Sequence, residues 1–228
     1  MKTNTEIKGL VLSNQEYKDN DAIITVLCRE GIRKVYARGV LKPTSKNRRI
    51  CQPFSLVEYN IQERNNGFDL LMQGNLIAYY YTIQQDLFAQ SICFVVRDCI
   101  LHSHSNEWIY EYLLRCWQHF HQQSQRAVGY ALLVLRECMK AEGISPYISG
   151  CIRCQRTDRI ETISLQEGGF LCRGCNAGRY PAYQKEQIVQ IHSLFHARND
   201  QSEQLLDTYS FNVDDIEFWA NWIQHHLS

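Results

Sequence analysis

Four cysteines in two C-x2-C pairs are the feature that most constrains how this 228-residue chain can fold. Cys151 and Cys154 form the first pair, Cys172 and Cys175 form the second, and 17 residues separate the pairs. This spacing is typical of zinc sites with four thiolate ligands, because two such turns can hold four sulfurs about 2.3 Å from one ion. We therefore expect one structural zinc ion whose coordination is complete, with no position open to water or substrate.

The sequence around the cysteines is typical of a zinc ribbon. Residues 161–172 are expected to form a small hairpin that turns at Gly168-Gly169. Glycines border both cysteine turns, and glycine readily adopts the positive φ that such turns often need. They are Gly150, Gly174 and Gly178. Two alternatives remain open, namely two redox disulfides or four unrelated buried thiols.

The composition favours an intracellular protein with a substantial core. The chain is 45% hydrophobic and long enough for one large domain or two small ones. Residues 1–8 are polar and charged, so no signal peptide is expected, and no apolar run approaches the roughly 18 residues that span a bilayer. Ten cysteines without an export signal indicate the reducing cytoplasm. Six of them are expected to be small core residues: Cys28, Cys51, Cys93, Cys99, Cys116 and Cys138.

The first 80 residues are expected to form five short strands. These span residues 7–12, 22–28, 32–40, 55–61 and 68–73. Asn65-Asn66-Gly67 is a strong signal for a hairpin turn between the last two. Five strands in so short a segment favour a closed barrel of the OB type, since closure removes exposed strand edges.

From residue 83 the apolar period becomes helical. The first helix is expected to bury Phe88, Ile92, Val95, Val96 and Cys99. Asn106 is expected to cap a second helix, Gly143 and Pro146 to end a third, and residues 185–197 and 216–227 to form two more. The predicted fold class is α+β: an N-terminal five-stranded OB-type β-barrel in residues 1–80 is followed by an α-helical domain in residues 81–228. A four-cysteine zinc ribbon at residues 148–180 interrupts the helical domain.

The sequence contains no familiar catalytic signature. It lacks a phosphate-binding loop, a nucleophile elbow, an H-E-x-x-H helix and a dinucleotide-binding glycine motif. We therefore expect neither enzymatic activity nor a small-molecule substrate. A zinc-dependent deaminase would need an open zinc and an H-x-E arrangement, which is absent. His192 and His196 have i,i+4 spacing, but no cysteine or carboxylate at ligand spacing accompanies them, so no second metal is expected.

Positive charge is concentrated near the N-terminus, although the net charge of the chain is zero. Residues 1–50 carry 11 basic and 5 acidic side chains, and the rest carry 13 and 19. Such a field attracts polyanions, and OB barrels bind single strands through cationic grooves and stacked rings. The candidate DNA-binding residues are Arg33, Lys34, Tyr36, Arg38, Lys42, Lys46, Arg48 and Arg49. Lys34, Tyr36 and Arg38 are expected to share a strand face. The alternative is that this basic segment is only a well-solvated surface.

Several short motifs in the first 60 residues occur together in one known family. They are the Tyr17–Asp21 stretch, Ala37-Arg38-Gly39, Lys42-Pro43 and Gln52-Pro53-Phe54. Together with the cysteine array in the helical half, they make the chain similar to the RecO family of bacterial recombination-repair mediators. The resemblance covers nearly the whole length and is loosest in the helices.

The resemblance implies a cytoplasmic, nucleoid-associated bacterial protein with an OB domain, a helical domain and often a zinc ribbon. It implies binding of single- and double-stranded DNA, annealing of complementary strands, and help in loading RecA onto coated DNA in the RecF pathway. The implied protein partners are RecR and the C-terminal tail of single-stranded DNA-binding protein. Arg38 and Lys42 are the basic positions that match the family. The alternative is a scaffold whose helical half docks partners, with only secondary DNA contact.

Overall fold

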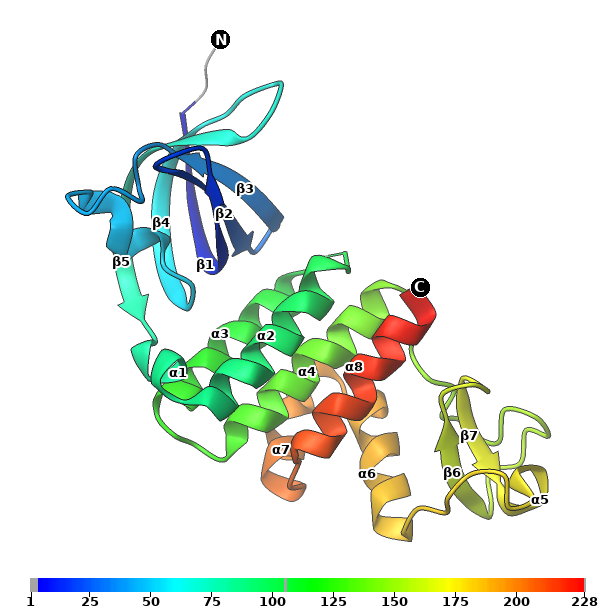
Figure 1. Cartoon of the computed structure of the whole chain (residues 1–228). Helices are drawn as coiled ribbons and strands as arrows, with labels where there is room; N and C mark the ends of the chain where they lie inside the picture. Colours follow the sequence, from blue (N-terminus) through cyan, green and yellow to red (C-terminus); the bar gives the residue numbers. More distant parts are fainter. Residues whose placement is uncertain (1–3, 105, 228) are drawn as a thin grey trace.

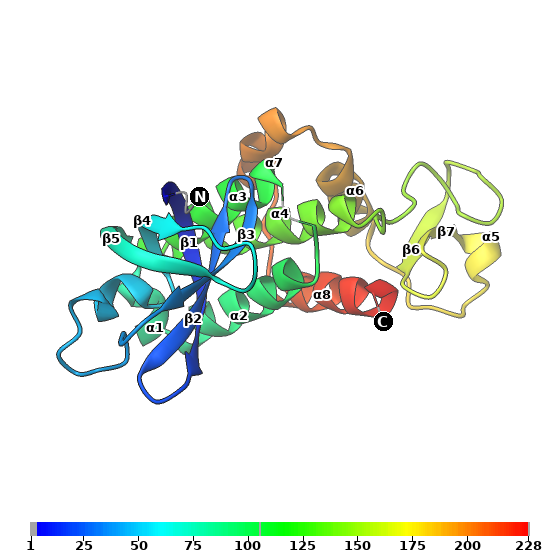
Figure 2. The same ribbon diagram turned by 90° about the horizontal axis from the view of Figure 1, so that it is seen from above.

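A computed structural model describes residues 4–104 and 106–227 of the chain. A β-barrel at the N-terminus is followed by a bundle of helices, and a two-stranded ribbon lies at the end of the bundle away from the barrel (Figures 1 and 2). The barrel, the helical bundle and the ribbon confirm the predicted fold class. Within the described residues, the helices are too short or too polar to cross a bilayer.

The barrel is built from five strands that lie where the sequence predicts them, although several begin or end at other residues. The strands are β1 (Asn4–Tyr17), β2 (Asp21–Cys28), β3 (Gly31–Ala37), β4 (Ser55–Gln62) and β5 (Asp69–Tyr79). They close in the order β1-β2-β3-β5-β4. Neighbours are antiparallel except at the closure, where Val35 and Tyr36 of β3 pair in parallel with Asp69 and Leu70 of β5. The Asn65-Asn66-Gly67 turn joins β4 and β5 as predicted, with φ of +96° at Gly67.

The strand predicted over residues 32–40 needs correction. β3 ends at Ala37 rather than at residue 40, because residues 38–40 turn away from the sheet. The basic segment that follows contains a 3-10 helix, η1 (Lys46–Cys51). Its buried Ile50 and Cys51 anchor the segment on the barrel core, which leaves the basic side chains between them and β3 exposed.

The barrel has two apolar surfaces, one inside and one outside. Inside, Val26, Val35 and Val57 contribute to a core of their own. Outside, Leu27 and Phe54 belong to the core of the helical bundle. In β2, where seven of the eight residues are buried, the inner core therefore takes Ala22, Ile24, Val26 and Cys28, and the bundle takes Leu27.

The helical half contains the expected long helices and some short ones that the sequence does not reveal. The bounds are α1 (Tyr81–Gln85), α2 (Leu87–Leu101), α3 (Glu107–His121), α4 (Arg126–Ala141), α6 (Lys185–His196), η2 (Asn199–Gln201), α7 (Ser202–Thr208) and α8 (Val213–Leu227). The ribbon comprises β6 (Ile160–Ser164), β7 (Gly169–Cys172) and α5 (Arg173–Asn176). The predicted cap of α3 is confirmed, because the Asn106 side chain accepts a hydrogen bond of 3.0 Å from the Ile109 N–H.

The predicted buried face of α2 is partly wrong. Phe88 and Val95 are 51% and 36% exposed, and smaller side chains such as Ala89 and Cys93 are buried in their place. Large apolar residues mark both faces of α2, so its sequence does not say which face meets α4.

Helix α4 lies at the centre of the bundle and is buried even at its charged residues. Arg136 is 0% exposed and is hydrogen-bonded on several sides. Its guanidinium donates to Glu137 at 3.0 Å, to the Leu194 carbonyl at 3.1 Å and to Asn199 Oδ1 at 2.6 Å. It also donates to Ser202 Oγ at 3.2 Å. One buried cation therefore ties the end of α6, η2 and the start of α7 to α4.

We predict that Arg136→Ala lowers the free energy of unfolding by about 3–5 kcal/mol, because it leaves several buried acceptors unpaired and removes one of the two cations that pair with the Glu137 carboxylate. Urea denaturation followed by tryptophan fluorescence measures this, since all four tryptophans lie in α3 and α8. Arg115→Ala is the matched control. Arg115 forms an exposed 2.8 Å ion pair with Glu203, and losing it should cost no more than about 1 kcal/mol. Equal losses in the two variants would contradict the assigned role of Arg136.

Candidate metal centre and nucleic-acid interface

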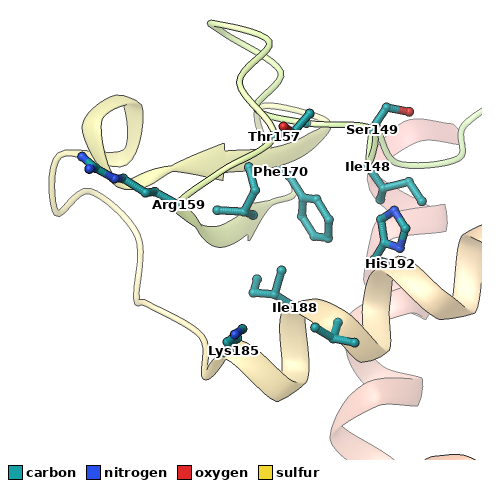
Figure 3. Close-up of a pocket in the computed structure, with 11 residues that line it drawn as sticks. Ile148, Ser149, Thr157, Arg159, Phe170, Lys185, Ile188 and His192 are labelled. Carbon is teal, nitrogen blue, oxygen red and sulfur yellow. The ribbon is translucent and has the colours of Figure 1, made fainter.

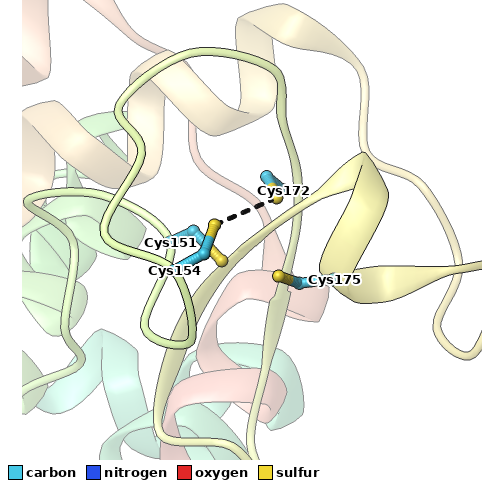
Figure 4. A group of neighbouring side chains, drawn as sticks. All are labelled: Cys151, Cys154, Cys172 and Cys175. Carbon is cyan, nitrogen blue, oxygen red and sulfur yellow. Dashed lines mark hydrogen bonds between the residues drawn. The ribbon is translucent and has the colours of Figure 1, made fainter.

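The ribbon brings the four array cysteines together in space. Cys151 and Cys154 lie in the turn before β6, Cys172 ends β7, and Cys175 lies in α5. All four sulfurs lie within 4.8 Å of one another, and 3.7 Å separates the Cys154 and Cys172 sulfurs (Figure 4). The predicted hairpin is confirmed, with Ile163 opposite Phe170. The cluster could therefore hold a metal ion.

The backbone of the two cysteine turns differs from the prediction. Gly178 does have a positive φ, at +74°, but Gly150 and Gly174 do not. The left-handed positions belong instead to Gln155 and Ala177, which follow the cysteine turns with φ of +64° and +47°. Gly150 is needed for close packing, because a Cβ there would lie 2.9 Å from a backbone carbonyl oxygen across the turn.

The electrostatics of the cluster suit a bound cation. Burial raises the pKa of the Cys151 thiol, but backbone N–H donors from Cys172, Cys154 and Arg153 outweigh burial and lower its pKa to about 6. Cys175 behaves oppositely, since its hydrogen bonds, first to Cys154, together with desolvation raise the pKa of its thiol to about 12. Four thiolates side by side would repel one another, so a bound cation would stabilise them. A metal that binds here would displace the protons from those cysteines that still carry them, Cys175 among them.

A groove separates the ribbon from α6 (Figure 3). Its volume is about 560 Å³, and Ile148, Phe170 and Ile188 are among its apolar lining residues. Arg159 and Lys185 also line it and are exposed. The groove thus combines an apolar surface with cationic side chains. His192, which also lines the groove, stacks on His196 with ring centroids 5.0 Å apart. Within the described part of the chain, only the cysteines form a group that could hold a metal.

The predicted DNA-binding residues lie on β3 and on the segment 38–51, which projects from the barrel (Figure 1). Lys34 is exposed on β3 and Tyr36 is half-buried. Arg38 lies just beyond the end of the strand, in the turn, so only Lys34 and Tyr36 share a strand face. The remaining exposed cations on this segment are Lys42, Lys46, Arg48 and Arg49.

Of the seven lysines and arginines predicted to bind DNA, six have no carboxylate within 4.0 Å among residues 4–104 and 106–227. They are Lys34, Arg38, Lys42, Lys46, Arg48 and Arg49. Arg33 differs, because it approaches Asp69 at 3.6 Å and Glu63 at 3.9 Å. The unpaired group leaves this side of the barrel able to attract a polyanion.

Asp21 organises the turn that carries Arg38. Its carboxylate accepts hydrogen bonds from the Tyr36 hydroxyl and from the Gly39 N–H, the latter at 2.6 Å. The Tyr36 hydroxyl, followed by the Gly39 N–H, lowers the pKa of Asp21, and slight desolvation opposes them. The Leu41 N–H also donates to the Asn20 carbonyl at 3.0 Å. The β1–β2 turn therefore holds the start of the basic segment against the barrel.

Tyr17, Lys18 and Phe68 adjoin this surface, although the sequence does not identify them as DNA-binding residues. Tyr17 is 42% exposed and Phe68 is 39% exposed. The ring centroid of Tyr17 lies 5.9 Å from that of Tyr36 and 6.5 Å from that of Phe68. The Lys18 Nζ lies 5.3 Å from the Tyr17 ring centroid. The available signal was an aromatic residue, Phe68, beside the predicted Asn65-Asn66-Gly67 turn.

Comparisons with known proteins place this geometry in context. The model "Recombination protein O N terminal" matches residues 1–80, and "Recombination protein O C terminal" matches residues 82–183. The chain is 27% identical over 202 residues to "DNA repair protein RecO" of Syntrophomonas wolfei, covering 84% of this chain and 78% of that protein. It is 26% identical over 198 residues to the protein of the same name from Bacillus subtilis, covering 84% of this chain and 77% of that protein.

We predict that the protein binds one equivalent of a divalent metal and that Cys154→Ser abolishes stoichiometric binding, because three thiolates remain. Elemental analysis of protein purified under reducing conditions without chelator measures the content. Cys99→Ala is the matched control, since Cys99 is a buried cysteine on α2, outside the cluster. Full metal content in Cys154→Ser, or its loss in Cys99→Ala, would refute the assignment.

Proposed function

This chain belongs to the RecO family, and from that premise we propose that it is a DNA-repair and recombination mediator. It binds single- and double-stranded DNA, anneals complementary strands, and helps to load RecA onto coated single-stranded DNA in the RecF pathway. The single observation that supports this best is the row of unpaired cations on β3 and the segment 38–51. The proposed location is the bacterial cytoplasm, in association with the nucleoid.

The physical basis of annealing is the repulsion between two sugar-phosphate chains. Exposed lysines and arginines lower this repulsion by replacing condensed counterions at the phosphates. Contacts to phosphates carry no sequence information and leave base edges free to pair. In this mechanism the protein makes and breaks no covalent bond, so it acts as a mediator rather than as an enzyme.

We further propose that the metal is one structural Zn²⁺ ion. A tetrahedron of four sulfurs at about 2.3 Å from zinc has edges of about 3.8 Å. The 3.7 Å between the Cys154 and Cys172 sulfurs fits this edge, and the other separations need only small adjustments. Four cysteine ligands leave no open coordination position, which supports a role in folding the ribbon.

The proposed protein partners are RecR and the C-terminal tail of single-stranded DNA-binding protein. Family membership supports both. A second candidate function is that of a scaffold whose helical half docks partners, with DNA contact secondary. Exposed apolar side chains on α1 and α2 favour it, since Tyr81, Leu87 and Phe88 are 49%, 81% and 51% exposed. The groove beside the ribbon is a further surface of this kind.

A double charge reversal separates the two candidates. Six phosphate contacts predict a slope of log affinity against log salt of about −4 for single strands. Arg38→Glu with Lys42→Glu removes two contacts and should weaken binding roughly tenfold or more at about 0.15 M salt. Strand annealing should fall in parallel, while pull-down of RecR survives.

The matched control is Arg159→Glu with Arg173→Glu, which reverses two exposed arginines on the ribbon. It changes the net charge equally and should leave DNA affinity within about twofold. DNA binding and annealing near wild-type levels in the barrel variant would overturn the mediator proposal and favour the scaffold.

Chelation tests whether zinc does more than fold the ribbon. The ribbon and the barrel lie at opposite ends of the molecule (Figure 1). Removing the metal should therefore increase amide hydrogen exchange in β6 and β7 and leave the DNA affinity of the barrel unchanged within about twofold. A loss of DNA affinity in step with the loss of metal would contradict a purely structural role.

A further inference from the structure

Three aromatic rings gather at the corner of the barrel where the basic segment begins. Tyr17 ends β1, Tyr36 lies on β3, and Phe68 immediately precedes β5. The ring planes of Tyr17 and Tyr36 meet at 86°, and those of Tyr17 and Phe68 meet at 81°. Because the contacts are edge-to-face, the rings do not cover one another by stacking.

The exposure of these rings is a cost that the fold does not explain. Tyr17 and Phe68 are 42% and 39% exposed, whereas Tyr59 on the inner side of the barrel is fully buried. Tyr36 is held in place, because its hydroxyl donates to the Asp21 carboxylate. The corner thus presents fixed aromatic surface to solvent, on a barrel that also exposes the non-aromatic Met72 and Ile77 of β5.

The cations around the rings indicate what kind of molecule this surface meets. Lys18 places its ammonium group 5.3 Å from the Tyr17 ring centroid. Arg38 is two residues beyond Tyr36 and is exposed, and the Gly39–Asp21 hydrogen bond fixes its turn beside the rings. Rings alternating with cations match a single nucleic-acid strand, whose bases stack on the rings while its phosphates pair with the cations.

We infer that Tyr17, Tyr36 and Phe68 form a base-stacking platform that gives the barrel a preference for single-stranded over double-stranded DNA. The preference arises because neighbouring base pairs cover both faces of a base in a duplex, while a single strand can offer its base faces to the protein. Asp21 is a positioning residue, since it orients Tyr36 without facing the base itself. This inference rests on the proposed DNA-binding function and specifies which strand form the barrel selects.

A change in the ligand tests the platform without disturbing the fold. Wild-type protein is titrated with an oligodeoxythymidylate and with an abasic oligomer that has the same number of phosphates. Stacking on two or three rings should make the base-bearing strand bind roughly 10- to 100-fold more tightly. 2-Aminopurine placed within the oligomer should lose fluorescence on binding, as it does when it stacks.

Variants identify the rings responsible. Tyr17→Ala with Phe68→Ala should reduce the ratio of base-bearing to abasic affinity at least fivefold and leave affinity for duplex DNA within twofold. Tyr17→Phe with Phe68→Tyr keeps both rings and should keep the ratio. Phe88→Ala removes a similarly exposed ring from α2 and should also keep it. Circular dichroism and thermal melting check that each variant remains folded.

Asp21→Ala tests the positioning role, because the affinity for each oligomer and the ratio of the two affinities respond differently to loss of charge and to loss of ring orientation. It removes a negative charge, so a purely electrostatic effect would raise affinity for both oligomers equally. Loss of Tyr36 orientation should instead lower the ratio, whereas loss of the Gly39 hydrogen bond, which holds the Arg38 turn, should act on both oligomers alike and leave the ratio unchanged.

The possible outcomes separate this inference from the proposed function. An unchanged ratio in the folded Tyr17→Ala, Phe68→Ala variant, or equal wild-type affinity for both oligomers, would overturn the platform while leaving phosphate binding intact. If wild-type protein bound neither oligomer, the proposed function and the platform would both fail. If the rings only brace the barrel, the double variant would melt earlier and keep its base preference.

Discussion

The apolar contact between the barrel and the helical bundle is the interaction on which the rest of the structure depends. Phe54 lies at its centre, with its ring centroid 5.4 Å from that of Trp117 and 5.9 Å from that of Phe94. Phe54 has a positive φ of +65°, an unusual conformation for a bulky residue. Its N–H donates to the Val11 carbonyl and its carbonyl accepts from the Tyr80 N–H. These bonds and the tight packing hold the strained residue in place.

This contact decides which side of the barrel is free. It covers Leu27 near the end of β2, while Lys34 on β3 and the basic side chains of the segment 38–51 remain exposed. An elongated arrangement follows, with the candidate nucleic-acid interface at one end and the four-cysteine cluster at the other (Figure 2). The two sites are therefore independent in space, and each can be altered without touching the other.

The features that sequence could predict are those fixed by local spacing. The clustering of the four cysteines, the Asn65-Asn66-Gly67 hairpin and the Asn106 cap each depend on short-range spacing, and all three occur as expected, although the glycines of the cysteine turns do not all have the expected φ. Features fixed by distant partners were not predictable. The buried face of α2 depends on α4, and the burial of Arg136 depends on acceptors about 60 residues away along the chain.

The candidate interface divides in the same way. Local charge density identifies its cations, but it cannot distinguish Arg33, which approaches Asp69, from Lys34 beside it. That distinction requires the parallel register of β3 and β5, which the barrel closure creates. The meeting of Tyr17 with Phe68 likewise requires closure, because the two residues are 51 positions apart in sequence.

The proposed platform and the proposed annealing activity make different demands on a base, and the geometry satisfies both. Stacking uses the flat face of a base, whereas pairing uses its edge. A strand whose phosphates lie along the segment 38–51 can rest a few bases on Tyr17, Tyr36 and Phe68 while its remaining bases stay free to pair. Once pairing begins, the strand becomes part of a duplex in which adjacent base pairs stack on both faces of each base, so the rings lose their hold on the strand. The surface that binds a single strand would therefore bind the annealed product less tightly, which favours its release.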